Sequence, residues 1–228
     1  MPDLINYQEE AYNKLKQMVI HADLTPGATV NKKALEQQLN IGATPLREAL
    51  IRLQREGLFR VIPQRGTYVA KINLNEVYQA RFVRENIEKE VCVEAAQKMT
   101  PKSLNELKKI IQLQQVYLQM NDFNNFFELD ERFHKLFYTI AEKNFIWEWL
   151  QPLNFQFDRF RFLRLEVKSL NWEQIIAQHQ AIITYTENGD LQQLQQIVSK
   201  HLHMVDADVE NVVAAFPDYF EDVPKIDQ

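Results

Sequence analysis

Four side chains in the C-terminal two thirds of the chain are of the types that bind divalent metal ions. Asp130 and His134 are four residues apart, which places both on one face of an α-helix within reach of a shared ion. His179 and His201 follow in later segments with a helical pattern. Helical bundles build metal sites from such groups on facing helices, and this donor set suits zinc, nickel, cobalt, iron or manganese. The pattern predicts a metal site.

The same residues have other interpretations. A lone helical histidine is commonly a surface or hydrogen-bonded core residue, and the Asp-x-x-x-His spacing arises by chance in many helices. His203 follows His201 by two residues and therefore points to another face, as expected for a surface residue. A metalloenzyme is the rival from another class, because such a site can activate water. A helical body that only dimerises, with histidines that bind nothing, is the third interpretation.

Arginine recurs in the same part of the chain. The residues are Arg81, Arg84, Arg159, Arg161 and Arg164. Buried arginine binds carboxylates through its planar fork, so each could hold an acidic ligand. Each could equally pair with an acid of the chain itself, as Arg84 could with Glu88 at i,i+4 spacing.

The elements that must position these groups are helices from residue 74 to about 214. The predicted helices cover residues 75–99, 103–120, 122–143, 145–167, 171–188 and 190–215. Gly189 lies at a helix C-cap position and Asp190 can cap the helix that follows. Short connections make neighbouring helices antiparallel, which predicts an all-α antiparallel helical bundle. Residues 216–228 are expected to be a loose tail.

The N-terminal segment predicts a different fold. Helices are expected over residues 6–21 and 32–39, followed by a third that Thr44 caps and Pro45 starts. Two short helices joined by a tight turn form a helix-turn-helix, whose second helix can lie in the major groove. Alternating residues in 58–62 and 67–71 around a Pro-Gln-Arg-Gly turn predict a hairpin, or wing. The alternatives are a solvated charged helix and an ordinary surface hairpin.

Composition supports two domains with different partners. The 228 residues have a net charge of −5, but residues 1–71 hold ten Lys/Arg against seven Asp/Glu. The remainder holds sixteen against twenty-four, so only the first part is expected to meet a polyanion. The single cysteine, Cys92, excludes an internal disulfide framework and fits a reducing compartment. With no apolar run of transmembrane length, the protein is expected to be soluble and cytoplasmic.

These residues resemble a known family. Thr44 to Leu50, Glu56-Gly57-Leu58 and Pro63 to Val69 are similar to the winged-helix domain of GntR-type transcription regulators. The bundle resembles the FCD-type sensing domain of the FadR-like branch. Its marks are Glu128-Leu129-Asp130, Phe133-His134, Asn144, His179, Gly189-Asp190 and His201. The resemblance covers about residues 7 to 214.

The resemblance implies a homodimer that binds a palindromic operator, most often as a repressor, and is not an enzyme. It implies three regions: residues 1–72 bind DNA, residues 73–215 bind an effector and dimerise, and residues 216–228 are the tail. It also implies that a divalent metal, zinc first, binds in the bundle. The ligands carried over are Asp130, His134, His179 and His201. A small carboxylate such as a sugar acid or hydroxy acid would bind beside the metal and nearby arginines. The arginines predicted for this role are Arg81, Arg84 and Arg159.

The DNA contacts are also carried over by position. They are Lys33, Thr44, Pro45, Arg47, Arg52, Arg65 and Gly66. One departure is notable, because Gly42-Ala43 stands where the family commonly has Ser-Arg. An arginine expected at the front of the recognition helix is therefore missing, which puts the operator sequence in doubt.

Overall fold

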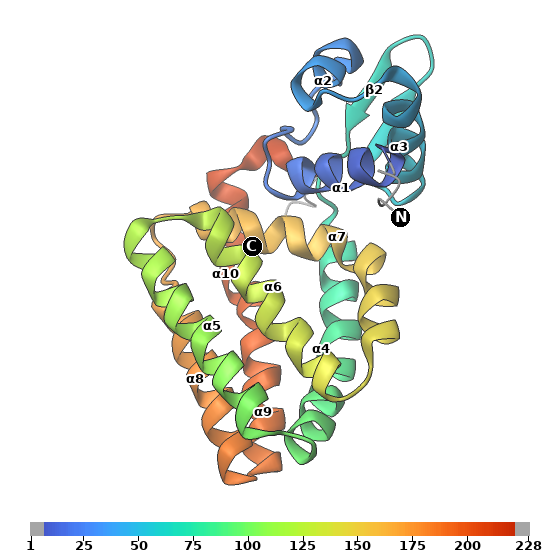
Figure 1. Cartoon of the computed structure of the whole chain (residues 1–228). Helices are drawn as coiled ribbons and strands as arrows, with labels where there is room; N and C mark the ends of the chain where they lie inside the picture. The colour runs from blue at the N-terminus through green and yellow to red at the C-terminus, as the bar shows by residue number, and fades with distance from the viewer. Residues whose placement is uncertain (1–6, 222–228) are drawn as a thin grey trace, which may run out of the picture. The chain divides into compact units, whose positions relative to one another are not determined.

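The computed structural model describes residues 7–221, and these divide into two compact units (Figure 1). The first unit contains the N-terminal part to Leu74 and also the segment from Phe216 onward. The second unit runs from Asn75 to Ala215. The division follows the predicted boundary near residue 72, with one difference at the C-terminus.

The first unit contains three helices and a hairpin. Its elements are α1 (Tyr7–Ile20), α2 (Lys32–Leu39), α3 (Ala43–Arg55), β1 (Phe59–Ile62) and β2 (Gly66–Val69). The strands pair antiparallel, with Phe59 opposite Val69 and Ile62 opposite Gly66. Leucines of α3 face α1 across a dry core in which Leu15, Leu46 and Leu53 are at most 1% exposed. The predicted helix-turn-helix and wing are therefore present.

Local capping explains where α2 and α3 begin. Asn31 accepts a hydrogen bond from the Ala34 amide, as an N-cap residue does, and Asn40 ends α2 in a left-handed conformation. Helix α3 begins two residues earlier than predicted, with Gly42 as its N-cap and no side-chain cap bond. Thr44 is therefore not the cap. Pro45 is tolerated in the first turn because amides there have no intrahelical acceptor.

The second unit is a bundle of helices. They are α4 (Leu74–Gln97), α5 (Pro101–Met120), α6 (Phe123–Ile140), α7 (Asn144–Glu166), α8 (Glu173–Asn188), α9 (Leu191–Leu202) and α10 (Met204–Ala215). Helix α5 packs against α6 and α8, and α7 packs against α6 and α10. Figure 1 shows α5, α6, α8 and α9 running alongside one another. The predicted fold class, a winged helix followed by an all-α bundle, is confirmed.

Two predictions about the C-terminal part need correction. The predicted helix over residues 190–215 is two helices, because the chain turns at His203, whose ring bonds the Ser199 carbonyl at 3.1 Å. Neither glycine nor proline marks the break, so the helical pattern hid it. The predicted loose tail is ordered over residues 216–221, where η1 (Pro217–Tyr219) leads into a bridge between Phe220 and Ile72. Residues 222–228 lie outside the described residues.

Candidate functional site

The structure brings the four predicted metal ligands together in the bundle interior. Asp130 and His134 lie one turn apart on α6, His179 lies on α8, and His201 lies at the end of α9. All four are buried, and one ligand atom from each lies within 4.8 Å of the others. Asp130 Oδ1 is 3.4 Å from His179 Nε2, and the Nε2 atoms of His134 and His201 are 3.2 Å apart.

Each histidine ring is oriented by an oxygen acceptor behind it. His179 Nδ1 donates to Gln114 Oε1 at 2.9 Å, and His201 Nδ1 donates to Gln178 Oε1 at 2.9 Å. His134 Nδ1 makes a short contact with the carboxylate of Glu88, which can only accept. A proton on each Nδ1 leaves the Nε2 lone pair free, and all three Nε2 atoms point to the common centre. This outer layer is the usual support of metal-bound histidine.

The centre fits a divalent cation. The Nε2 atom of His179 is buried and has no hydrogen-bond partner among the described residues. Lone pairs of the three imidazoles face the Asp130 carboxylate there, an arrangement that a cation would stabilise. Three imidazole nitrogens and one carboxylate oxygen suit a borderline transition metal and leave coordination positions open for a ligand.

Protonation states agree with this interpretation. Burial, which disfavours imidazolium, lowers the pKa of His179 to about 3, and it also lowers the pKa of His201 well below its ordinary value. Burial alone would raise the pKa of Asp130, but the charge of the neighbouring Arg161 guanidinium, the largest opposing cause, holds that pKa below its ordinary value. Neutral imidazole and ionised carboxylate are the forms that bind metal.

A network of buried charges surrounds Asp130 on one side. Arg161 contacts Asp130 closely and pairs with Glu131 at 2.6 Å and Asp158 at 2.9 Å. Arg84 donates to Glu88 at 2.9 Å and approaches Asp158 within 3.7 Å. Because burial and the neighbouring Glu131 both disfavour its charge, the pKa of Asp158 rises to about 7. Arg161 thus holds the ligand Asp130, and Arg84 holds Glu88, which contacts the ligand His134.

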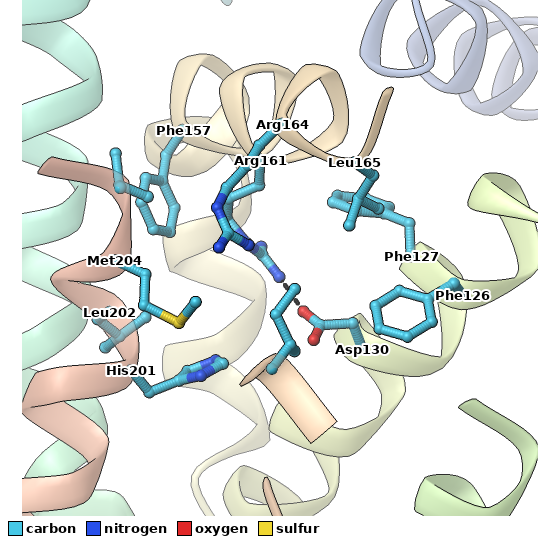
Figure 2. A pocket seen from close by; sticks show the side chains of 12 residues that line it. Phe126, Phe127, Asp130, Phe157, Arg161, Arg164, Leu165, His201, Leu202 and Met204 are labelled. Atoms are coloured by element: carbon cyan, nitrogen blue, oxygen red, sulfur yellow. Dashed lines mark hydrogen bonds and ion pairs between the residues drawn. The ribbon is translucent and has the colours of Figure 1, made fainter. Parts of the chain in front are cut away.

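A cavity opens beside the cluster (Figure 2). Its polar wall consists of Asp130, His201, Arg161 and Arg164. Its remaining lining is apolar: Phe126, Phe127, Phe157, Leu165, Ile175, Leu202, Met204 and Val205. Figure 2 shows the guanidinium of Arg161 reaching Asp130, with the phenylalanine rings around them. A ligand here would meet both charged groups and hydrocarbon side chains.

The arginines that line the cavity differ from those predicted to bind the effector. Arg81 pairs with Glu85 at 2.8 Å and with Asp206 at 3.1 Å, away from the cavity. Arg84 and Arg159 are buried but do not line the cavity either. The two arginines that do are Arg161 and Arg164 of α7. From Asn154 to Leu165 almost every residue of α7 is buried, so the hydrophobic pattern could not identify the cavity face.

Three residues that support the histidines of the cluster were not predicted from the sequence. Glu88, Gln114 and Gln178 contact histidines that are 46, 65 and 23 residues away along the chain. Glu88 was considered only as a partner of Arg84, a contact that it also makes. No spacing rule connects these acceptors to their histidines. A polar residue on a helix face that is otherwise apolar was the one available signal.

The predicted DNA contacts lie in the first unit. Thr44 and Arg47 are exposed at the start of α3, and Lys33 is exposed on α2. Neither Lys33 nor Arg47 has an ion pair within residues 7–221. The α3 start also offers backbone amides without a side-chain cap, and such a helix terminus can bind phosphate.

The wing tip is basic and open. Arg65 and Gly66 are exposed, and Gly66 has φ +113°, which L side chains rarely adopt. A Cβ atom at this position would contact nothing within 4 Å, so conformation rather than space favours glycine. Arg60 and Lys71 add exposed positive charge near the hairpin and were not predicted.

Arg52 is different from the other predicted DNA contacts. Its guanidinium pairs with Glu9 at 2.9 Å and Glu56 at 3.3 Å and lies 3.5 Å from the ring centre of Tyr12. These contacts hold α3 against α1, so its charge is already neutralised within the unit. The structure therefore favours a structural role for Arg52 rather than the predicted phosphate contact.

Comparison with known proteins agrees with this two-part organisation. Residues 7–69 match the family described as "Bacterial regulatory proteins, gntR family", and residues 76–204 match the FCD domain. Within the described residues, no helix is long and apolar enough to cross a membrane. The predicted resemblance is confirmed over both parts of the chain.

Two relatives extend over nearly the whole chain. The HTH-type transcriptional repressor RspR of Escherichia coli (strain K12) is 28% identical over 214 residues, covering 94% of this chain and 93% of RspR. An uncharacterized HTH-type transcriptional regulator in an unstable DNA locus of Streptomyces ambofaciens is 30% identical over 213 residues, covering 93% and 89%. These relatives are regulators and not enzymes, so the metalloenzyme interpretation has no support among them.

Solved structures show the same fold. E. coli McbR/YncC superposes with a TM-score of 0.80 at 18% identity, covering 93% of this chain and all of McbR/YncC. The structure described as "a putative transcriptional regulator GntR from Rhodococcus sp. RHA1" gives a TM-score of 0.70 at 16% identity, covering 92% of this chain and 98% of that one. At these identities the likeness concerns the fold alone.

Proposed function

The chain belongs to the GntR family of bacterial regulatory proteins and carries an FCD domain, and from this premise we propose that it is a dimeric repressor controlled by a carboxylate metabolite. The observation that carries the proposal is the separation of two sites. An exposed basic surface lies on the winged helix, and a buried Asp/His cluster opens onto an arginine-lined cavity in the bundle. DNA binding and effector sensing therefore have separate residues.

On the DNA side, Thr44 and Arg47 contact base edges or backbone from the start of α3 in the major groove. Lys33 contacts phosphate, and Arg65 with Gly66 enters the minor groove at the wing tip. Pro45 sets the backbone of the first turn. Absence of an arginine at positions 42 and 43 leaves Arg47 as the foremost arginine of this helix, so operator selectivity depends on it most.

In the bundle, Asp130, His134, His179 and His201 hold a divalent metal, with zinc as the first candidate and nickel, manganese or iron as alternatives. A bound metal would supply a fixed positive charge beside the cavity that favours an anionic effector. Arg161 and Arg164 provide further positive charge on the cavity wall. The phenylalanines opposite them favour an effector with an apolar body over a heavily hydroxylated sugar acid.

A dimer is needed to read a palindrome, because each winged helix covers one half-site. The support for a pairing surface is a row of exposed apolar side chains on α7. Phe145 is 79% exposed and Trp149 59% exposed, and Leu153 continues the row at i,i+4 spacing. Rows of this size on a surface usually mark an interface. We assign a second copy of the chain to this α7 surface.

The proposed function is tested by binding the full-length, metal-loaded protein to the DNA upstream of its own gene. Binding should be sequence-selective and should weaken linearly in log affinity with log salt concentration. Absence of selective, salt-sensitive binding would reject the proposal. For the dimer, Trp149→Glu should give a monomer by light scattering. The matched control is Phe82→Glu, an exposed aromatic side chain on α4 outside the α7 row, which should stay dimeric.

A further inference from the structure

Helix α10 forms part of the cavity wall and is tied to α7 by an ion pair. Met204 and Val205 of its first turn line the cavity, next to His201 at the end of α9. One turn further, Asp208 contacts Arg164 closely, and the two side chains are only 14% and 7% exposed. Arg164 also lines the cavity. The same guanidinium is therefore available to a ligand on one side and to α10 on the other.

The cavity is too small for a metabolite in this conformation. The depression and its mouth measure about 450 Å³, but the centre of a water molecule can occupy only about 40 Å³ of it. By that measure one buried water needs roughly 10–15 Å³, so the space holds about three waters. A carboxylate with an apolar body needs more room, and some part of the wall must move. Helix α10 is the part of the wall that begins at an interruption between two helices, at His203.

The far end of α10 leads directly into the DNA-binding unit. Helix α10 ends at Ala215, and Phe216 onward belongs to the unit that contains the winged helix. There the Ile72 amide donates to the Tyr219 carbonyl at 2.8 Å, and the Glu221 amide donates to the Ile72 carbonyl at 2.9 Å. Asn73 adds a side-chain bond to Glu221 at 2.8 Å.

These bonds join the two places where the chain passes between the units. One passage follows Asn73 into α4, and the other leaves α10 at Ala215. Because the C-terminal segment is bonded to Ile72, it cannot move independently of the winged-helix unit. A displacement of α10 is therefore transmitted to that unit through the covalent connection from Ala215 to Phe216.

We propose that Asp208 competes with the effector's carboxylate for Arg164. Asp208 pairs with Arg164 in the effector-free protein and is displaced when the effector binds. One guanidinium fork holds one carboxylate well, so the two compete for the same donors. Displacement frees α10 from α7, and the connection at residues 216–221 passes the change to the DNA-binding unit. An effector shifts the equilibrium only as far as it prefers the released arrangement. This inference rests on the proposed function.

The first test measures DNA affinity without any effector. Asp208→Asn removes the competing charge and should change the dissociation constant for the upstream DNA at least fivefold, because α10 is released. Glu210→Gln is the matched control, since Glu210 lies on the same helix, is exposed and has no ion pair within residues 7–221. It should bind like the parent. A change below fivefold in folded, DNA-binding Asp208→Asn protein overturns the inference, whereas loss of selective DNA binding by the parent rejects the proposed function instead.

Two further measurements keep the inference testable if a variant is unstable. Acetate serves as the probe for the anion site: 50 mM acetate should raise the melting temperature of Asp208→Asn more than that of Glu210→Gln. It should not raise that of Arg164→Gln. Equal shifts in all three variants overturn the proposal. A chain ending at Ala215 should lose the effect of Asp208→Asn on DNA affinity, and retention of the effect removes the C-terminal connection from the mechanism.

Discussion

Arginines in the two units of this protein have opposite environments. Arg47 and Arg65 of the winged helix are exposed, and neither has an ion pair within residues 7–221. Arg84 and Arg161 of the bundle are buried, and each contacts three carboxylates. An exposed, unpaired arginine can neutralise a phosphate at little cost, whereas a buried one must already be paired to be stable. The comparison shows that surroundings, not residue type, distinguish a contact for DNA from a support for a buried site.

The largest expected effect comes from breaking the buried side of this comparison. Arg84→Met keeps roughly the same volume but removes the buried guanidinium that pairs with Glu88 at 2.9 Å and Glu131 at 3.4 Å, so it should destabilise the bundle by ~3–5 kcal/mol. That corresponds to a melting temperature lower by roughly 10 °C. All three tryptophans, Trp147, Trp149 and Trp172, lie in the bundle, so urea unfolding followed by their fluorescence reports this unit alone.

Arg132→Met is the control for that variant. Arg132 pairs with Glu106 at 2.9 Å, but the side chains are 57% and 42% exposed. An exposed pair contributes at most about 1 kcal/mol, so this change should be nearly silent. Equal losses in both variants would contradict the interpretation of Arg84 as a buried charge that requires its partners.

Metal removal should have the next largest effect. A metal held at a hundred times its dissociation constant adds ~2.7 kcal/mol to stability, which a chelator should remove. His179→Ala should abolish both metal binding and the effect of the chelator on the melting temperature. His203→Ala should retain both, because His203 is exposed and bonded to Ser199 outside the cluster. Metal content by mass spectrometry checks the assignment independently.

Within the winged helix, substitutions of two arginines on α3 should have clearly different effects on DNA affinity. Arg47→Ala should weaken DNA binding by ~1–3 kcal/mol without changing stability, because its exposed side chain has no ion pair within residues 7–221. Arg52→Ala should change stability by under about 1 kcal/mol and leave the DNA affinity nearly unchanged, since Glu9 and Glu56 already hold it. A larger loss of DNA affinity in Arg52→Ala than in Arg47→Ala would reverse the assignment.

The smallest effect is a pH dependence in the same unit. Tyr12 donates to Glu56 at 2.9 Å, and burial, this bond and the carboxylate charge together raise the pKa of Tyr12. Because the pKa of Tyr12 is higher in the folded state than its unfolded value of about 10, the contribution of Tyr12 to the free energy of unfolding is complete below pH 10. This contribution falls progressively as the pH rises above 10. Tyr12→Phe should therefore lose less stability than the parent between pH 9 and 11, measured by far-ultraviolet circular dichroism. Parallel pH profiles would contradict the role of Tyr12.

The sequence predicted features that depend on residues a few positions apart. Helices predicted to begin near residues 32 and 122 do so, where the structure shows Asn31 and Asp122 as their caps, and Gly189 and Asp190 separate α8 from α9 as predicted. The wing was predicted from alternation and from the turn residues between its strands. The pairing of Asp130 with His134 on one helix face follows from helical periodicity. Each of these features is decided within one or two helical turns.

Tertiary structure decided which residues from different helices meet. It placed Arg161 and Arg164, rather than Arg81, Arg84 and Arg159, on the cavity wall. It supplied Gln114 behind His179 and joined Phe220 to Ile72 across the length of the chain. Helical patterns state that a face is buried but not which neighbour covers it. The sequence by itself therefore determined the two-part regulator and the residue types of the buried Asp/His cluster, and packing of the helices decided which charges support that cluster and which line the cavity.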